Sequence, residues 1–524
     1  MKEGYSMKIM LRMTIFILTC TLYPISCVLA NNLTVSNVSL YKAPGQPAGT
    51  IGVKFDLNWD NSFTGVDSNG QAFFDRAWVF IKYFNAADPV NTPWSHATLI
   101  SGGTVGDYST QTGVGISANS DTGKKVGAFC KPGANQVLYW NYGATDGDGV
   151  PDTTSISVKV MAIEMVYVPT SSFYVGSGGN ETYAFYRYPN PTDSYKITSE
   201  GAINVGTTAG NLYYPTGLYG GDQTGPIPAA FPKGYNGFYM MKYEITQGQY
   251  RDFLNTLSRT QQGARVWSDI SGDAPASNNV YVMTATTVVN GRQGLRCPWS
   301  GNGTTNPITF SCDLNSNGIG NEATDGEWVS CTFLSWYDLC AYADWAGLRP
   351  MTELEFEKAC RGPLFPVVNE YAWGSTSITA SATGPTNSGA NNEIATNSAN
   401  NVCASGGIGP FRSGFAATSS STRYAAGSSY YGIMELSGNS NERAVSVGTS
   451  AGRAFTGLHG DGVLTSGGSG NVLYWPDDST SGGSGFRGGG FVTGLPTSNR
   501  TETARGYSGG HWYGESGRCV RTSP

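Results

Sequence analysis

Side chains that carry oxygen recur at alternate positions in the segment 313–324. Position 6 of this segment is a glycine, and oxygens for a cation would come from positions 1, 3, 5 and, through the backbone carbonyl, 7: Asp313, Asn315, Asn317 and Ile319. This spacing reproduces the first half of an EF-hand loop, whose alternate oxygens converge on Ca²⁺. Position 12 is Thr324 instead of glutamate, so the second half differs. The segment predicts a calcium loop outside an EF-hand, with a polar Asn-Gly turn as the alternative.

A second acidic loop, DGDGVPD, occupies residues 146–152. Its carboxylates are Asp146, Asp148 and Asp152. The glycines between them would let the loop curl, so that alternate carboxylates could converge on a calcium ion. A plain hairpin turn explains the same residues at least as well, and this loop is the weaker of the two candidates.

The elements that could position functional groups are clearest at 335–362, where helix signals are dense in a chain rich in Gly, Ser and Thr. One apolar face recurs at helical spacing: Trp336, Leu339, Cys340, Ala343 and Ala346. Gly347 then ends the helix. Thr352 predicts a second helix, because its hydroxyl can accept from the backbone N–H of Glu355 while the Glu355 side chain reaches back. We expect this helix to run to about Cys360.

This helix pair resembles a core element of the formylglycine-generating enzyme family, also called the sulfatase-modifying-factor fold. The matching elements are a Trp-x-Asp helix, a Gly-x-Arg turn leading into Thr-Glu, and a Glu-x-Glu helix, at 336–338, 347–353 and 355–357. Further motifs follow in family order: FYMMKYEITQGQYRDFLN at 238–255, YYGIMELSGNSNER at 430–443, FRGGGF at 486–491 and SGRCVRT at 516–522. The resemblance covers the chain from about residue 162 to its end. It implies an α+β domain related in architecture to C-type lectins.

The resemblance also implies a structural calcium site in the segment 435–442. The family holds this ion with two side chains and two backbone carbonyls, and carrying that pattern over gives the side chains of Glu435 and Glu442 with the carbonyls of Gly438 and Ser440. Hard oxygen ligands on a tight loop suit Ca²⁺ better than a softer metal. The alternative is a pair of solvated glutamates beside a glycine turn.

Active members of this family oxidise a substrate cysteine with two copper-binding cysteines that follow the Arg-Gly-Gly strand. The two thiol positions fall here on Thr493 and Ser498. A hydroxyl cannot replace a thiolate as a soft ligand for Cu(I), so we expect no copper and no formylglycine chemistry. Related iron-dependent sulfoxide synthases use a histidine cluster, whereas the histidines of this chain, His96, His459 and His511, are widely scattered.

The N-terminal 30 residues are typical of a secretory signal peptide, with Lys8 and Arg12 before an apolar run and a small-residue cleavage site ending at Ala30. Lipidation of Cys27 is the alternative. No other apolar run approaches the ~20 residues of a membrane-spanning helix. The formal net charge of −6 provides no basic footprint for nucleic acid. We therefore expect a secreted or cell-surface protein.

Residues 31–160 alternate in hydrophobicity over short segments bounded by turn residues, which predicts an antiparallel β-sandwich. The expected strands are 33–40, 51–59, 77–84, 96–99, 114–116, 126–129, 136–140 and 155–160. Residues 161–524 would form the second domain, with insertions at 177–232 and 260–330. Within it, 238–244 is expected to be a strand, and Thr246 with Gln249 predicts a capped helix over 246–257.

Eight cysteines remain after the leader, and an even number in an exported chain favours disulfides over metal thiolates. In the resembled family a cysteine on the first core helix bridges to a C-terminal one. Cys519 takes the terminal place, while the helix position is Ala343, with Cys340 one turn earlier on the same face. The resemblance thus implies a Cys340–Cys519 bridge as one possible pairing.

Without the thiol pair, the favoured interpretation is a non-catalytic binding or assembly protein stabilised by calcium. Its ligand would be a glycan or a protein outside the cell or at its surface, because aromatic and Arg side chains suit both. The candidate ligand-facing residues surround the former catalytic cleft: Trp475, Arg487, Phe491, Arg500, Arg505, His511 and Trp512. For each of them the alternative is ordinary packing, or a salt bridge for the arginines. The alternative function is an oxidoreductase of the same superfamily with an unidentified metal site.

Overall fold

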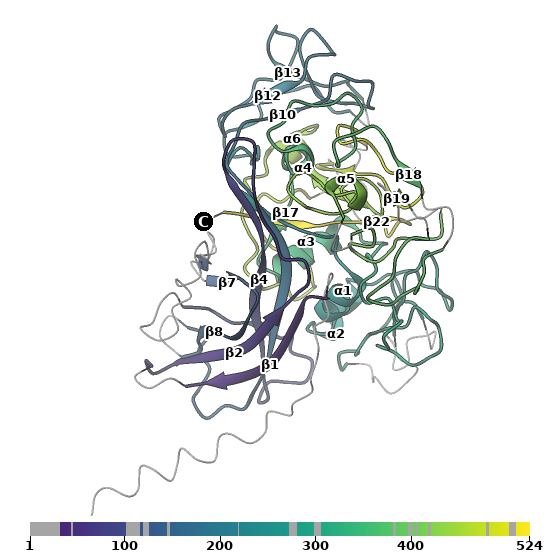
Figure 1. Cartoon of the computed structure of the whole chain (residues 1–524). Helices are drawn as coiled ribbons and strands as arrows, with labels where there is room; N and C mark the ends of the chain where they lie inside the picture. The colour runs from purple at the N-terminus through teal and green to yellow at the C-terminus, as the bar shows by residue number, and fades with distance from the viewer. Residues whose placement is uncertain are drawn as a thin grey trace, which may run out of the picture.

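The structure is a computed structural model. It describes residues 32–42, 46–100, 116–118, 125–143, 147–217, 220–271, 280–297, 305–380, 384–396, 402–404, 407–417, 421–477, 482–501 and 510–523. The described chain combines many strands with a few short helices, as an α+β fold requires (Figure 1). Asp146 and Arg505, together with the expected signal peptide, lie outside the described residues.

Eight of the first nine strands overlap the predicted segments, with shifts at their ends, whereas β3 lies in a stretch where no strand was predicted. The nine strands are β1 Thr34–Tyr41, β2 Thr50–Asn58, β3 Thr64–Val66, β4 Ala72–Asn85, β5 Ser95–His96, β6 Ile116–Ala118, β7 Lys125–Cys130, β8 Gly133–Asn141 and β9 Ile156–Val168. Strands β4 and β9 are longer than expected, because both continue beyond the N-terminal segment's own core.

The later strands are short and separated by long loops. They are β10 Phe173–Val175, β11 Tyr186–Arg187, β12 Tyr195–Ile197, β13 Leu212–Tyr213, β14 Phe238–Met241, β15 Leu295–Arg296, β16 Ser311–Cys312, β17 Arg349–Pro350, β18 Thr379–Ala380, β19 Val402–Ala404, β20 Asn441–Val445, β21 Ser484–Arg487, β22 Glu515–Ser516 and β23 Cys519–Thr522.

The described helices begin at capping residues. They are α1 Gln247–Leu254, α2 Arg259–Gly263, α3 Trp336–Trp345, α4 Glu353–Arg361, α5 Arg423–Ala426 and α6 Ser450–Arg453. The predicted capping boxes at Thr246 and Thr352 are both present, with Gln249 and Glu355 as their reciprocal partners. The predicted apolar face of α3 is buried throughout. Gly347 adopts the positive φ of 68° that helix ends favour.

One long sheet runs through the whole protein, in the order β17-β23-β14-β9-β4-β7-β6, with β3 and β5 also paired to β4. Strand β9 pairs with β4 on one side, from Ile156 opposite Asn85 to Val166 opposite Asp75, and with β14 on the other. The domain boundary expected at 160/161 therefore falls inside β9. The N-terminal segment and the C-terminal domain share a single sheet.

Strand β4 is buried on both faces, and its alternate side chains enter two different cores. Ala77, Val79 and Ile81 pack with the three-stranded sheet β1-β2-β8. Trp78 and Phe80 point the other way, into the core that contains side chains of α1 and α3. The two sheets thus face each other as in a sandwich, but one of them is the long sheet. A β-sandwich domain limited to residues 31–160 stays a prediction.

The cysteines whose side chains are described, seven in number, are buried and free of disulfide bonds. Cys340 and Cys519 lie in the same hydrophobic core, and the bridge that the resemblance implies between them stays a prediction. Burial raises the pKa of Cys130 and Cys360 to about 12, which keeps these thiols protonated and unreactive at neutral pH. Within the described part of the chain, no helix has the length and hydrophobicity needed to cross a membrane.

Candidate functional site

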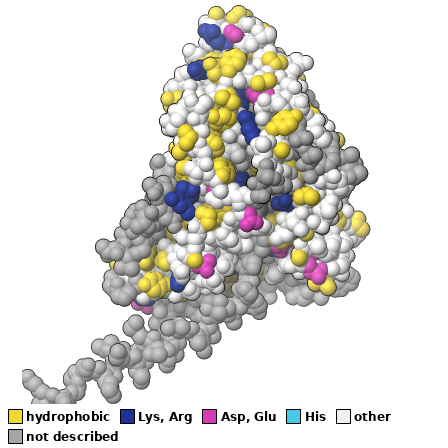
Figure 2. All heavy atoms as spheres, in the orientation of Figure 1, with side chains coloured by type: hydrophobic (Ala, Val, Ile, Leu, Met, Phe, Trp, Pro, Cys, Tyr) yellow, Lys and Arg dark blue, Asp and Glu magenta, His cyan; other side chains and the backbone are white. Residues whose placement is uncertain are grey.

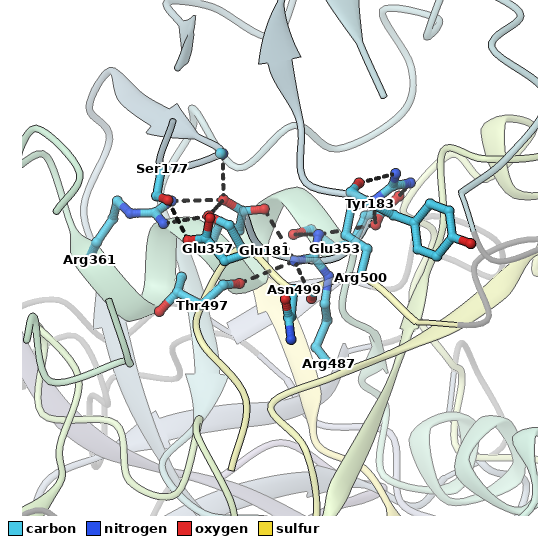
Figure 3. Close-up of polar contacts among 12 residues, drawn as sticks. Ser177, Glu181, Tyr183, Glu353, Glu357, Arg361, Arg487, Thr497, Asn499 and Arg500 are labelled. Carbon is cyan, nitrogen blue, oxygen red and sulfur yellow. Dashed lines mark hydrogen bonds and ion pairs between the residues drawn. The ribbon is translucent and has the colours of Figure 1, made fainter. Parts of the chain in front are cut away.

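The segment where the resembled family keeps its cysteine pair follows β21 and lies against helix α4. Two carboxylates, Glu353 and Glu357, stand one helical turn apart on α4 and face this segment. Arg487, at the end of β21, lies between them, with Nη2 3.1 Å from Glu353 Oε2 and Nη1 3.1 Å from Glu357 Oε1. Arg500 binds the other side of Glu353 with its Nε at 2.7 Å and its Nη2 at 2.9 Å (Figure 3).

This ion-pair network is closed to solvent. Glu353 and both arginines, Arg487 and Arg500, have at most 1 % of their surface exposed. Burial alone would raise the pKa of Glu353, but the positive charges of Arg500 and Arg487 outweigh that effect and lower it to about 2. Both oxygens of Glu353 are thus charged and fully used within the protein. The network holds loops in place, and neither the Arg487 nor the Arg500 guanidinium faces solvent.

The two former thiol positions have very different surroundings. Ser498 is fully buried; its hydroxyl accepts from Arg361 Nη2 at 2.8 Å and donates to Glu357 Oε2 at 3.1 Å. Thr493 is exposed. Ser498 therefore belongs to the same network of buried charges, and neither oxygen can supply the soft sulfur donor that Cu(I) requires. The residues present do not fit a copper centre.

The insertion at 177–232 packs onto this network. The backbone carbonyls of Tyr183 and Gly220 accept hydrogen bonds from Arg500 Nη1, both at 3.1 Å. Near its start, Ser177 donates to the buried carboxylate of Glu181 (Figure 3). The insertion therefore helps to seal the former cleft from the side.

The structure separates the predicted ligand-facing residues into buried and exposed groups. Arg487 and Arg500 form the salt bridges that were the alternative prediction for them. Phe491 is buried, and its ring centroid lies 4.7 Å from that of Tyr513. Trp475 is half-buried, with its Nε1 donating to the carbonyl of Leu458 at 2.9 Å.

Exposed aromatic side chains gather near the C-terminus. His511 is partly exposed, and its neighbours Trp512 and Tyr513 are 51 % and 45 % exposed. Trp267, whose ring centroid lies 5.2 Å from that of His511, is 49 % exposed. We call Trp267, His511, Trp512 and Tyr513 the aromatic face. Trp267 was missed because it stands in a long segment without periodicity, where no sequence signal marks it.

The expected calcium ligands Glu435 and Glu442 are buried in an acidic cluster. Arg518 binds both oxygens of Glu442, with Nε at 2.5 Å and Nη2 at 2.7 Å. Glu435 Oε1 accepts from the N–H of Gly414 at 2.9 Å, while Glu435 Oε2 is buried without a hydrogen-bond partner among the described residues.

Glu244, which was not among the predicted ligands, belongs to this cluster. Its Oε1 is also buried without a hydrogen-bond partner among the described residues. Burial raises the pKa of Glu244 and Glu435, the latter to about 7, and the neighbouring charge of Glu442 adds to both shifts. Three carboxylates thus surround one ion-paired guanidinium, Arg518. The two unpartnered oxygens fit a cation better than the engaged Glu442 does. The signal that could have revealed Glu244 is its position as a lone acid at the end of an apolar strand.

The loop at Asp313 has a different local structure. Asp313 is fully buried and pairs with Arg296, while its Oδ1 has no partner among the described residues. The side-chain oxygens of Asn315 and Asn317 accept from backbone N–H groups two residues further on, at 2.9 and 2.8 Å, and Ile319 is exposed. The unpartnered Oδ1 of Asp313 fits a cation, whereas the amide oxygens are already used in turns.

In the acidic loop at 146–152, Asp148 accepts from Thr98 and Trp140, as a structural carboxylate would. Among the described residues, no set of three or more His, Cys, Asp or Glu side chains is arranged to hold a metal ion. His459 is half-buried, and its Nε2 accepts from the N–H of Thr522 at 3.0 Å. The calcium sites stay predictions.

The C-terminal part of the chain matches a known protein family. A family model described as "Sulfatase-modifying factor enzyme 1-like domain" matches residues 161–522. A search of curated proteins found no match. The matched region begins inside β9 and ends in β23, which are two strands of the long sheet, and it includes the whole buried network around α4. Over these residues, the chain belongs to the family of sulfatase-modifying factor enzyme 1-like domains.

Proposed function

We propose that this protein is a non-catalytic, exported binding or assembly protein built on a sulfatase-modifying-factor domain. The observation that carries the proposal is the state of the two former thiol positions. Ser498 is enclosed between Arg361 and Glu357, and Thr493 is an exposed hydroxyl. The family's oxidation of cysteine needs two sulfurs at one copper ion, and these groups supply none.

We expect copper-loaded protein to leave a Cys-x-Pro-x-Arg peptide unmodified. Mass spectrometry of the peptide measures this directly, because conversion of cysteine to formylglycine changes its mass. An active family member treated with the same copper and peptide is the control. Turnover by this protein would overturn the proposal in favour of an oxidoreductase with a different site.

The surface supports a role in binding. On the face shown in Figure 2, hydrophobic side chains form scattered patches among uncharged groups, and charged side chains are few. Charged residues make up 13 % of the sequence and aromatic residues 12 %. A ligand would therefore contact aromatic and neutral polar groups, and such a surface suits glycans and protein loops. Of the predicted ligand-facing residues, His511 and Trp512 belong to the aromatic face.

The proposal includes structural calcium and export. Calcium would bind in the acidic cluster of Glu435, Glu442 and Glu244, where the unpartnered buried oxygens of Glu435 and Glu244 are hard donors. Export would use the N-terminal leader, with cleavage near Ala30. Mass spectrometry of the mature N-terminus tests the leader, and a chain that retains residues 1–30 would contradict export by cleavage.

We expect calcium to raise the melting temperature of the wild-type protein and Glu435→Gln to remove most of that increase. A ligand at a hundredfold excess over its Kd stabilises the folded state by about 2.7 kcal/mol. Without calcium the variant should be nearly as stable as wild type, because burial already raises the pKa of Glu435 to about 7 and a neutral amide resembles the protonated acid. Thermal melts with calcium and with a chelator measure both effects.

The matched control for this experiment is Glu322→Gln, because Glu322 is a carboxylate of the loop at Asp313 and accepts a hydrogen bond from the side chain of Asn317. If Glu322→Gln removes the calcium effect and Glu435→Gln does not, the ion binds at the Asp313 loop. If calcium does not change the melting temperature of the wild type, both calcium sites are wrong.

A further inference from the structure

Trp267 and His511 form a corner of two aromatic rings within the aromatic face. Their centroids are 5.2 Å apart and their planes meet at 56°. The two residues are far apart in the sequence, and about half of the surface of Trp267 is open to solvent. The exposed indole provides an apolar ring surface to a ligand, and the imidazole, whose side chain is 13 % exposed, borders that surface at an angle.

The orientation of His511 is fixed by buried groups. Its Nδ1 lies 2.8 Å from the carbonyl of Phe333, and because a carbonyl can only accept, Nδ1 carries the proton. Asp338 Oδ2 lies 3.5 Å from the same nitrogen. Asp338 is itself held by the N–H of Ser335 at 2.9 Å and by Arg265 Nη1 at 2.9 Å. The imidazole is therefore anchored in one tautomer.

This anchoring leaves Nε2 as the acceptor nitrogen of a neutral imidazole. The described residues give neither His511 Nε2 nor Trp267 Nε1 a hydrogen bond. Among the described residues, the corner thus leaves one acceptor and one N–H donor without a partner beside the indole surface. Its anchoring charges cancel, since Arg265 is paired with Asp338, so no free cation of this group is available to attract an anionic ligand.

We propose that the corner of Trp267 and His511 is a binding subsite for a neutral sugar ring. A pyranose has an apolar C–H face that can stack on the indole, and hydroxyl groups that donate to His511 Nε2 and accept from Trp267 Nε1. The inference rests on the proposed binding function and names its ligand class. Asp338 and Arg265 act as positioning residues, because they orient the imidazole without touching the ligand.

The test uses the full-length mature protein on an array of neutral and acidic oligosaccharides, followed by calorimetry with the best neutral one. Wild type should bind at least one neutral oligosaccharide. Trp267→Ala should weaken that binding about tenfold or more, because truncating a central aromatic contact removes a large part of a small interface. His511→Phe keeps the ring and removes the acceptor, and should also weaken binding.

The matched control is Phe365→Ala, since Phe365 is 70 % exposed in the loop after α4 and should leave the affinity unchanged. Circular dichroism verifies that each variant is folded. Binding only to acidic glycans or to protein ligands, no binding to any neutral glycan, or unchanged affinity in Trp267→Ala would each overturn the sugar subsite. These outcomes leave the non-catalytic proposal intact, whereas oxidation of the peptide by copper-loaded protein would overturn that proposal.

Discussion

Removal of residues 31–155 is expected to leave the C-terminal domain unfolded, although the family match begins only at residue 161. The deletion takes away β4, the partner of β9 along the long sheet, and four core side chains: Trp78, Phe80, Val126 and Phe129. Burying such side chains contributes about 1.5–3 kcal/mol each, so the loss of about 6–12 kcal/mol is comparable to the total stability of a typical domain. Circular dichroism and the solubility of residues 156–524 measure the result.

A single substitution tests the same idea in the complete chain. Trp78 donates to the carbonyl of Ala346 at 2.8 Å, and Arg521 lies over its ring at 4.3 Å, so it links β4 to α3 and β23. Trp78→Ala should cost about 3–5 kcal/mol of unfolding free energy. The control, Trp512→Ala, removes an exposed tryptophan and should change stability by about 0.5 kcal/mol or less. A folded, cooperatively melting 156–524 fragment would contradict the shared core.

Glu353→Gln is expected to destabilise the protein by about 3–5 kcal/mol. The substitution leaves the buried guanidinium of Arg500 without a charged partner and removes one of the two ion pairs of Arg487. Denaturant unfolding of wild type and variant measures the difference. The control is Asp222→Asn. Asp222 pairs with Arg453, but its side chain is 37 % exposed, and pairs of this kind are worth about 0–1 kcal/mol.

The pH dependence of stability provides a second measurement on Glu353. Its folded pKa of about 2 lies below the ordinary value of 4.5, so the stability that it contributes is present above pH 4.5 and is lost as pH falls toward 2. We expect the unfolding free energy of wild type to fall in this window and that of Glu353→Gln to fall less. Equal slopes for the two proteins would show that the pKa of Glu353 is the same in the folded and unfolded states.

The local elements of this protein could be predicted from its sequence. A capping box involves only residues three apart, and the boxes at Thr246 and Thr352 formed as predicted. Alternation of side chains along a strand is equally local, and it located the strands of residues 33–160 except β3. The family motifs around α3 and α4 were also visible in the residue types alone.

The tertiary structure decided how those elements are joined and which side chains reach solvent. The pairing of β4 with β9 depends on register between distant segments, and no local pattern specifies it. Arg487 and Arg500 were expected to face a ligand, but Glu353 and Glu357 neutralise them inside the domain. Burying a charge is favourable only where its partners converge, and the meeting of Trp267 with His511 likewise depends on the fold that brings them together.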